Sequence, residues 1–365
     1  MEIQAAVCRV KGSFILEQVD LSEPQADEVL VKIVACGMCH TDLAVRDQHL
    51  PLPLPAVLGH EGAGIVAKVG GGVSKFRPGD HVVLSYGSCG KCGNCLAGRP
   101  AYCAEFLAYN VGTRRPDGSC THQQHGKALT GAFFYQSSFA TYALTHVRNV
   151  VKVANDLPLE VLAPLGCGIQ TGAGAVFNCL RPQAGSSIAI FGAGAVGLSA
   201  VMAAAVAGCA VIVVVDVLDS RLTLARELGA TCVIDARSTD PVAAVRAACA
   251  GGVDSAVEAT GLPAVMTQAF DSLNSTGTVV VLGVAPAGAT ISLDASSLLG
   301  GKKIRGAIEG ESVPEVFIPQ LIALWKAGKF PFDRLAKYYS LEQINEAAHD
   351  SERGLAIKPI IRMPV

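Results

Sequence analysis

Short apolar runs rich in β-branched residues and separated by glycine, proline and aspartate characterise the first 150 residues. Three of these runs are VLVKIVACGMC (residues 29–39), GAGIVAKVG (residues 62–70) and DHVVLSY (residues 80–86). Runs of this length that end at turn-forming residues are typical of β-strands rather than helices. The pattern therefore predicts a mostly-β region over residues 1–150.

The pattern changes from about residue 170, where continuous apolar runs alternate with helix-like segments. The runs are SSIAIFGAG, AVIVVVD, CVID, VDSAVEAT and TVVVLGV, and the segments between them include AVGLSAVMAAAVAG and SRLTLARELG. Apolar strands that alternate with helices indicate a parallel sheet covered on both faces. We therefore predict an α/β protein, with mixed elements again after about residue 308.

Composition and charge exclude several classes of protein. Of the 365 residues, 50% are hydrophobic and 16% are charged, and the net charge is −2 with no run of Lys and Arg, so nucleic acid is not an expected partner. No stretch is long and apolar enough to predict a membrane span. The N-terminal residues do not resemble a secretory leader, so the thirteen cysteines indicate a reducing compartment and metal thiolates. A cytoplasmic enzyme is expected.

Four cysteines lie close together in a glycine-rich stretch. Their spacing is C-x2-C-x2-C-x7-C, and they are Cys89, Cys92, Cys95 and Cys103. Four thiolates on a short loop complete a tetrahedral shell around Zn²⁺ and leave no open position, as a structural zinc site requires. Two disulfides or an iron–sulfur centre are the alternatives, and the x2 spacings disfavour direct disulfide pairing.

Three further candidate ligands are scattered along the chain. They are Cys39 in GMCHTD, His60 in LGHEGAG and Cys167 in LGCGIQTG. Two sulfurs and one imidazole would leave the fourth tetrahedral position for water or substrate, as a catalytic zinc requires. Their spacing alone is weak evidence, because the chain has many other cysteines.

A glycine-rich turn follows the first apolar run of the parallel-sheet region. Gly192, Gly194 and Gly197 form G-x-G-x-x-G in IAIFGAGAVG, directly before an alanine-rich segment. This motif allows a tight turn and places a helix N-terminus against a pyrophosphate. The next apolar run ends in Asp216, whose carboxylate would bond the ribose hydroxyls and favour NAD over NADP, although Arg221 nearby could tolerate a phosphate.

Together these motifs resemble the zinc-dependent medium-chain alcohol dehydrogenases over essentially the whole chain. The resemblance is carried by GHEGAGIV, the four-cysteine loop, GCGIQTGAG, FGAGAVG and VLGV. Within that family the stretch GAFFYQSSFATYAL makes the chain most similar to aryl- or allylic-alcohol dehydrogenases of the benzyl alcohol and geraniol types. The resemblance implies a GroES-like catalytic domain (residues 1–168 and 309–365) and a Rossmann NAD-binding domain (residues 169–308).

The resemblance also implies two zinc ions per subunit, and roles for residues around the catalytic one. The catalytic ion would be bound by Cys39, His60 and Cys167. Asp42 would accept a hydrogen bond from His60 and fix its tautomer. Further roles follow by resemblance: Glu61 is the carboxylate near the zinc, Thr41 takes the alcohol proton, and His40 faces the pyrophosphate.

Three more residues match cofactor contacts of the family. Thr171 would touch the nicotinamide, Lys358 is similar to a phosphate contact late in the chain, and Arg221 resembles the cation beside the adenine ribose. One departure concerns the proton relay, because Ala44 stands where some members have a second histidine. The relay would then end on the ribose and His40, or water or His49 would substitute.

The implied reaction is the reversible oxidation of a primary aromatic or allylic alcohol by NAD⁺ to the aldehyde. The resemblance places the substrate pocket near Ser85 and Tyr86 and along the segment from Phe106 to Tyr142. That segment supplies aromatic rings suited to an aryl or isoprenoid substrate, although each could equally be a core residue. These rings are Phe106, Phe133, Phe134 and Phe139.

Two alternative functions remain open from the sequence. A glutathione-dependent formaldehyde dehydrogenase would need cations for the tripeptide carboxylates, and Arg114 and Arg115 are candidates. A catalytically inactive zinc- and nucleotide-binding protein is the other alternative, which the complete set of metal ligands disfavours. The family resemblance further suggests a homodimer or homotetramer with no macromolecular partner of another kind.

Overall fold

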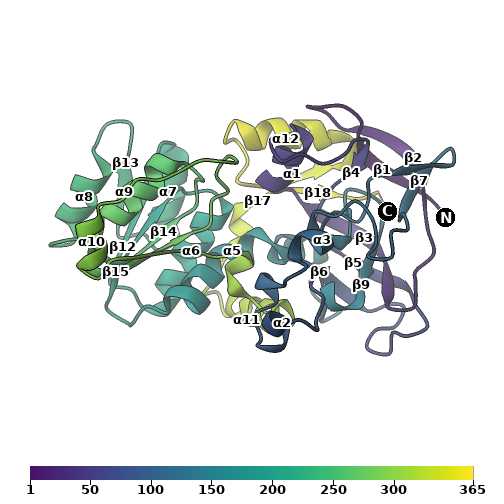
Figure 1. Cartoon of the computed structure of the whole chain (residues 1–365), viewed down its shortest axis with the longest axis horizontal. Helices are drawn as coiled ribbons and strands as arrows, with labels where there is room; N and C mark the ends of the chain where they lie inside the picture. Colours follow the sequence, from purple (N-terminus) through teal and green to yellow (C-terminus); the bar gives the residue numbers. More distant parts are fainter. Residues whose placement is uncertain (365) are drawn as a thin grey trace. The chain divides into compact units, whose positions relative to one another are not determined.

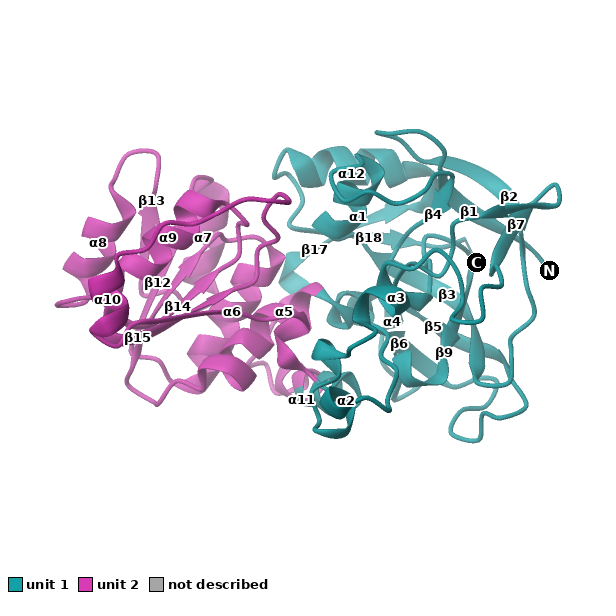
Figure 2. Ribbon diagram, viewed as in Figure 1, with its two compact units in different colours: residues 1–167, 313–320, 333–365 teal, residues 168–312, 321–332 magenta. Residues whose placement is uncertain are grey.

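The computed structural model describes residues 1–364, and the chain divides into two compact units. Unit 1 consists of residues 1–167, 313–320 and 333–365, and unit 2 of residues 168–312 and 321–332 (Figure 2). The expected boundaries at 168 and 309 therefore differ from this division in three places. Residue 168, residues 309–312 and residues 321–332 were expected in the first domain, but they belong to unit 2.

Unit 1 is built around two sheets. The five-stranded sheet has the order β4 (Ala56–Val57), β1 (Glu2–Cys8), β2 (Ile15–Leu21), β7 (His122–Gln124) and β8 (Lys127–Leu129). The seven-stranded sheet has the order β10 (Val150–Val153), β6 (His81–Leu84), β5 (Glu61–Val69), β3 (Glu28–Gly37), β18 (Lys358–Arg362) and β17 (Ala336–Ser340), and β9 (Tyr142–His146) also pairs with β3. The mostly-β character predicted for residues 1–150 is confirmed.

The helices of unit 1 are short. They are α1 (His40–Arg46), α2 (Gly93–Leu96), α3 (Phe106–Asn110), α4 (Leu159–Leu162) and α12 (Ile344–Glu352), together with the first part of α11 (Pro314–Lys326). One buried cluster joins β3, β5 and β6 to α1 and α12, and it includes Val31, Leu43, Leu84 and Ala347. α1, which begins directly after Cys39, is therefore packed into the core of unit 1.

Unit 2 contains a six-stranded sheet in which every neighbouring pair is parallel. Its order is β13 (Cys232–Asp235), β12 (Val211–Asp216), β11 (Ser187–Phe191), β14 (Val253–Glu258), β15 (Leu273–Val281) and β16 (Lys303–Gly306). The accompanying helices are α5 (Gly168–Gly174), α6 (Ala195–Ala207), α7 (Asp219–Glu227), α8 (Pro241–Ala248), α9 (Pro263–Asp271) and α10 (Ala295–Leu299) (Figure 1).

The alternation of strand and helix in unit 2 follows directly from its sequence pattern. β11 and β12 are almost wholly buried because helices cover both faces of a parallel sheet. α6 ends at Ala207 and is followed by Gly208, which adopts the left-handed conformation (φ 81°) that favours glycine after a helix. Among residues 1–364, no helix has the length and apolar composition that crossing a bilayer would require.

Candidate functional site

Cys39, His60 and Cys167 come together in unit 1, although 128 positions separate the first from the last. Cys39 directly precedes α1, His60 directly precedes β5 and Cys167 directly precedes α5. One ligand atom of each residue lies within 4.8 Å of the others. Three converging donors of this kind leave one tetrahedral position for an exchangeable ligand.

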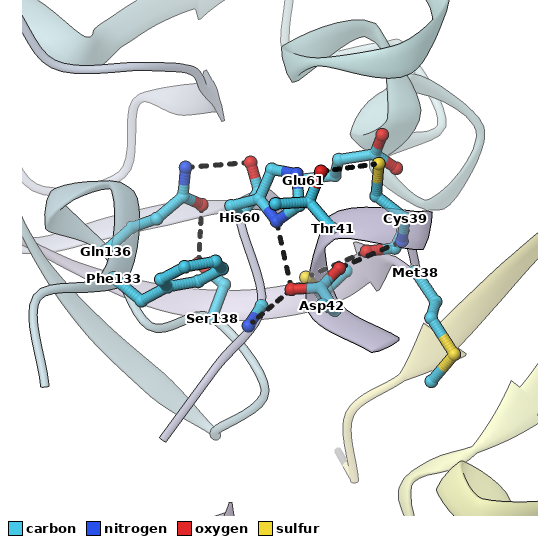
Figure 3. A network of polar contacts seen from close by, with 12 residues as sticks. Met38, Cys39, Thr41, Asp42, His60, Glu61, Phe133, Gln136 and Ser138 are labelled. Carbon is cyan, nitrogen blue, oxygen red and sulfur yellow. Dashed lines mark hydrogen bonds and ion pairs between the residues drawn. The ribbon is translucent and has the colours of Figure 1, made fainter. Parts of the chain in front are cut away.

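Asp42 fixes two of the three candidate ligands (Figure 3). Its Oδ1 lies 2.9 Å from Nδ1 of His60 and accepts the Gly59 N–H, while its Oδ2 accepts the Cys39 N–H at 2.9 Å. Asp42 is fully buried in the first turn of α1, where a carboxylate also interacts favourably with the helix dipole. Because Nδ1 of His60 is held by a carboxylate, Nε2 remains as the ligand atom.

The donor set fits a zinc ion. Among the described residues, the buried Nε2 of His60 has no hydrogen-bond partner. A hydrogen bond from Cys167 lowers the pKa of the Cys39 thiol well below its usual value, against the opposing effect of burial. A thiolate-forming cysteine beside an unsatisfied imidazole nitrogen is the chemistry that a catalytic zinc requires.

Glu61 and Lys358 form a buried ion pair next to this cluster. Nζ of Lys358 donates to both carboxylate oxygens of Glu61 at 2.9 Å and to the Met38 carbonyl at 3.2 Å. Gly37 makes room for the carboxylate, since a Cβ there would lie 2.0 Å from Glu61 Oε2. An ammonium has three donors, so the structure uses all of them at Glu61 and Met38 instead of leaving any for the expected phosphate contact.

The candidate proton-relay residues lie at the start of α1. The Cys39 thiol approaches Thr41 Oγ1 at 3.8 Å, which places the hydroxyl beside the cluster. His40 is exposed, Ala44 is half-buried, and His49 lies exposed just beyond the helix. The helix thus carries a hydroxyl at the cluster and an imidazole at the surface.

A segment with unusual backbone geometry packs on His60. The Phe134 ring is stacked on the imidazole with 4.4 Å between ring centroids, and Phe133 meets it edge-on at 5.5 Å. Ala132, Phe134 and two of the next three residues have positive φ values of 48–58°. Non-glycine residues rarely adopt this conformation, and such strain clusters at functional sites. Phe139 packs against Phe14, and Phe133, Phe134 and Phe139 all belong to the same buried core cluster.

The Sγ atoms of the four loop cysteines also converge to within 4.8 Å of one another. Main-chain N–H groups point at the sulfurs: Cys89 N–H donates to Cys103, Cys92 N–H to Cys89 and Ala104 N–H to Cys92. The Ala104 N–H is the main cause that lowers the pKa of Cys92 to about 6. Four converging sulfurs, three of which accept these main-chain hydrogen bonds, fit a closed, structural zinc site.

The glycine-rich turn joins β11 to α6 in unit 2. Gly192 has φ 94°, and a Cβ at Gly197 would lie 1.7 Å from the Gly192 carbonyl, so neither position admits a side chain. At Gly194, which precedes the first turn of α6, a Cβ would meet no protein atom within 4 Å. This open space above free helix N–H groups fits a pyrophosphate.

Asp216 and Arg221 lie at the carboxyl end of β12 and in α7. The Asp216 carboxylate accepts the Ala193 N–H of the glycine-rich turn at 2.6 Å and the N–H groups of Val217 and Leu218. The buried Nε of Arg221 has no partner among residues 1–364. Asp216 therefore ties the turn to β12, and Arg221 belongs to α7 with its Nε enclosed by protein.

Thr171 lies on α5 beside a carboxylate that the sequence did not single out. The Thr171 hydroxyl and the Gln170 amide approach Oε2 of Glu309 at 3.5 and 3.1 Å. Glu309, Gly310 and Glu311 all have positive φ, and Glu309 is buried. Three successive residues in this conformation form a turn that no short sequence motif indicates.

The structure thus brings together the seven cysteine and histidine ligands in their two clusters and groups Thr41, Asp42 and Glu61 around the first. It places Thr171 and the glycine-rich turn in unit 2. Gln136, whose amide donates to the His60 carbonyl at 2.9 Å, was not identified from the sequence, although it lies in a polar Gln-Ser-Ser run between aromatic residues.

Comparisons with known proteins agree with this geometry. Residues 25–155 match the family described as "Alcohol dehydrogenase GroES-like domain", and residues 195–326 match "Zinc-binding dehydrogenase". The chain is 47% identical over 362 residues to a geraniol dehydrogenase from Castellaniella defragrans, covering 98% of this chain and 97% of that protein.

Two solved structures are similar over their whole length, with 100% of each chain covered. One is an alcohol dehydrogenase zinc-binding domain protein from Burkholderia ambifaria, with 54% identity and a TM-score of 0.98. The other is benzyl alcohol dehydrogenase from Acinetobacter calcoaceticus, with 51% identity and a TM-score of 0.97. The chain therefore belongs to the zinc-dependent medium-chain alcohol dehydrogenases, with a GroES-like domain and a nucleotide-binding domain.

Proposed function

We propose that this alcohol dehydrogenase oxidises primary aromatic or allylic alcohols, such as benzyl alcohol and geraniol, reversibly to their aldehydes with NAD⁺. The observation that carries the proposal is the Phe134 ring stacked on His60, because it places an apolar surface directly against the metal cluster. The same substrate class is supported by two relatives, a geraniol dehydrogenase with 47% sequence identity and a benzyl alcohol dehydrogenase with 51%.

In the proposed mechanism, Zn²⁺ held by Cys39, His60 and Cys167 supplies Lewis acidity toward the alcohol oxygen, and NAD⁺ supplies the hydride acceptor. Asp42 keeps His60 in the tautomer whose Nε2 points into the cluster. The aromatic segment excludes water from one side of the cluster, which strengthens electrostatic interactions there.

Proton transfer is assigned to α1. The Thr41 hydroxyl, beside Cys39, takes the proton of the alcohol and passes it outward. The cofactor ribose and the exposed His40 are its proposed acceptors, with water or His49 as the substitute route because Ala44 cannot carry a proton. Glu61 balances the buried charge of Lys358 close to the ligands.

The cofactor is proposed to lie on the glycine-rich turn. The N–H groups at the start of α6 bind the pyrophosphate above Gly194, and Thr171 contacts the nicotinamide. The Asp216 carboxylate favours an unphosphorylated ribose because it would repel a 2′-phosphate. Arg221 on α7 is the proposed cation beside the adenine ribose.

The formaldehyde dehydrogenase alternative loses one of its two candidate cations. Arg115 is buried and donates to both carboxylate oxygens of Glu28 at 2.6 and 2.8 Å. Arg114 bonds the Gly118 carbonyl in an exposed turn. The convergence of three ligand atoms also argues against a catalytically inactive protein, because structural zinc sites usually have four protein ligands and only catalytic sites keep one position open.

Steady-state formation of NADH tests the proposal. With NAD⁺, kcat/KM for benzyl alcohol and geraniol should exceed the values for ethanol and hydroxymethylglutathione by at least about tenfold. The ratio of NAD⁺ to NADP⁺ activity should also favour NAD⁺. A preference for hydroxymethylglutathione, or activity only with short aliphatic alcohols, would overturn the proposed substrate class.

We also propose a cytoplasmic homodimer or homotetramer that binds only the cofactor and small alcohols or aldehydes. β16 is an edge strand of the parallel sheet. Leu298 and Leu299, which precede it in the chain, are exposed apolar residues. An uncovered strand edge beside apolar residues favours pairing with a second copy. Light scattering of the purified protein should give two or four times 37.6 kDa, and a monomer would refute this assembly.

A further inference from the structure

Gln136 is a fully buried side chain located where strands β5 and β6 separate. The antiparallel pairing of these strands ends at Ala63 and Val83. Beyond that point Oε1 of Gln136 accepts the Gly62 N–H at 3.1 Å, and its Nε2 donates to the Ser85 carbonyl at 3.3 Å. The amide therefore replaces main-chain bonds that the two strands no longer make to each other.

The same amide holds the main chain of a candidate zinc ligand (Figure 3). Nε2 of Gln136 donates to the His60 carbonyl at 2.9 Å, and the Ser138 hydroxyl donates to Oε1 at 2.8 Å. Two donors on the oxygen and two acceptors on the nitrogen leave only one orientation of the amide. A Cβ at Gly62 would lie 2.4 Å from Ser138 Oγ, so the segment approaches this strand as closely as it can.

Ser85 extends this connection to a second candidate ligand. Its hydroxyl donates to the Gly166 carbonyl at 2.6 Å, and Gly166 directly precedes Cys167. Gly166 is packed tightly, because a Cβ there would lie 2.1 Å from the Leu84 carbonyl. A chain of three polar contacts thus joins His60 to the residue before Cys167 through Gln136 and Ser85.

Asp42 already links Cys39 to His60, whereas the segment before Cys167 is held by the Ser85 hydroxyl. We propose that Gln136 is the positioning residue that fixes the spacing between His60 and Cys167, and so completes the geometry of the catalytic zinc site. This inference rests on the proposed function only in taking Cys39, His60 and Cys167 as the zinc ligands.

The test compares metal binding in Gln136→Met and Gln136→Glu with the unaltered protein. Met has a similar length and no amide, whereas Glu keeps the acceptor for Gly62 but places an oxygen against the His60 carbonyl. Outer partners of metal ligands typically contribute 10–100-fold to metal affinity. Chelator competition should therefore show catalytic-site affinity lowered by about that factor in both variants, with the four-cysteine ion unchanged.

Cobalt(II) placed in the catalytic site gives a second readout, because its absorption bands report ligand geometry. These bands should shift in Gln136→Met. They should shift less in Ser138→Ala, which removes only the hydrogen bond from Ser138 to Oε1 of Gln136. Asn345→Ala is the control: it removes another amide bonded to main-chain N–H and C=O groups, those of Phe14. It should leave metal affinity and the bands unchanged.

The outcomes separate a positioning role from a structural one. Lower thermal stability in Gln136→Met together with unaltered metal affinity and cobalt bands would overturn the proposal. Should Gln136→Met not fold, Ser138→Ala and Gln136→Glu decide by the same two readouts. The alcohol specificity does not enter these measurements. Retention of both ions by Cys39→Ala would instead refute the ligand assignment beneath the proposed function.

Discussion

Lys358 should be essential for the stability of unit 1. Its side chain is 3% exposed, its partner Glu61 is fully buried, and the two share a pair of 2.9 Å hydrogen bonds. Lys358→Met keeps most of the volume but leaves a buried carboxylate without a cation. Removing one partner of a buried pair costs about 3–5 kcal/mol.

A cost of this size should lower the midpoint of thermal unfolding by about 6 to 20 °C for a unit of roughly 200 residues. Circular dichroism can follow the transition. Lys68→Met is the matched control, because Lys68 is 58% exposed and its partner Glu23 is 69% exposed, so their contact is a surface ion pair. Exposed pairs contribute only about 0–1 kcal/mol.

The double variant Lys358→Met with Glu61→Gln should recover about 1–2 kcal/mol relative to Lys358→Met, because no uncompensated charge remains. The reasoning would be refuted if Lys358→Met unfolded at the same temperature as Lys68→Met and only raised KM for NAD⁺. That result would mean that Lys358 acts as a phosphate contact and that its pairing with Glu61 is energetically minor.

Three further predictions concern the metal sites and pH. Asp42→Asn should weaken binding of the catalytic zinc by about 10–100-fold in a chelator titration, because His60 loses its carboxylate partner; equal affinity would contradict that role. Cys92→Ser should leave one zinc ion per chain in elemental analysis and lower the unfolding temperature, and retention of two ions would exclude Cys92 as a ligand. Burial lowers the pKa of His122 from 6.5 to about 4. The unfolded chain therefore binds this proton first, so stability is full above pH 6.5 and falls by up to about 3 kcal/mol as the pH drops to 4. Urea unfolding of His122→Asn should lack this part of the pH dependence, and an unchanged slope would refute it.

Local motifs made much of this fold and site predictable. The four-cysteine loop and the glycine-rich turn are each encoded within about fifteen residues, so their geometry depends on nearby chain alone. The parallel sheet followed from apolar runs that only a doubly covered sheet can bury. The role of Asp42 was predicted from the family resemblance, and the structure places this residue in the first turn of α1, which begins directly after Cys39.

The buried polar pairs were not predictable, because they depend on long-range strand register. Lys358 reaches Glu61 only because β18 and β5 both pair with β3, where Gly37 lies opposite both Ile360 and Glu61. Arg115 likewise finds Glu28 across 87 positions. The sequence shows such residues as ordinary charges, and only tertiary structure decides which of them are paired.

The left-handed backbone around Phe134 and Glu309 was equally hidden. Propensity predicts positive φ at glycine, asparagine or aspartate, whereas here Phe, Tyr, Ser and Glu adopt it. Such conformations persist only when the surrounding packing imposes them. The turns at Phe134 and Glu309 therefore had to be found in the structure.

The most direct test of the whole account combines metal content with turnover in Cys39→Ala. The unaltered protein should contain two zinc ions per chain and form NADH from benzyl alcohol. The variant should contain one zinc ion and form none. Active protein without zinc, or full turnover in Cys39→Ala, would contradict the central claim that this cluster holds the catalytic metal.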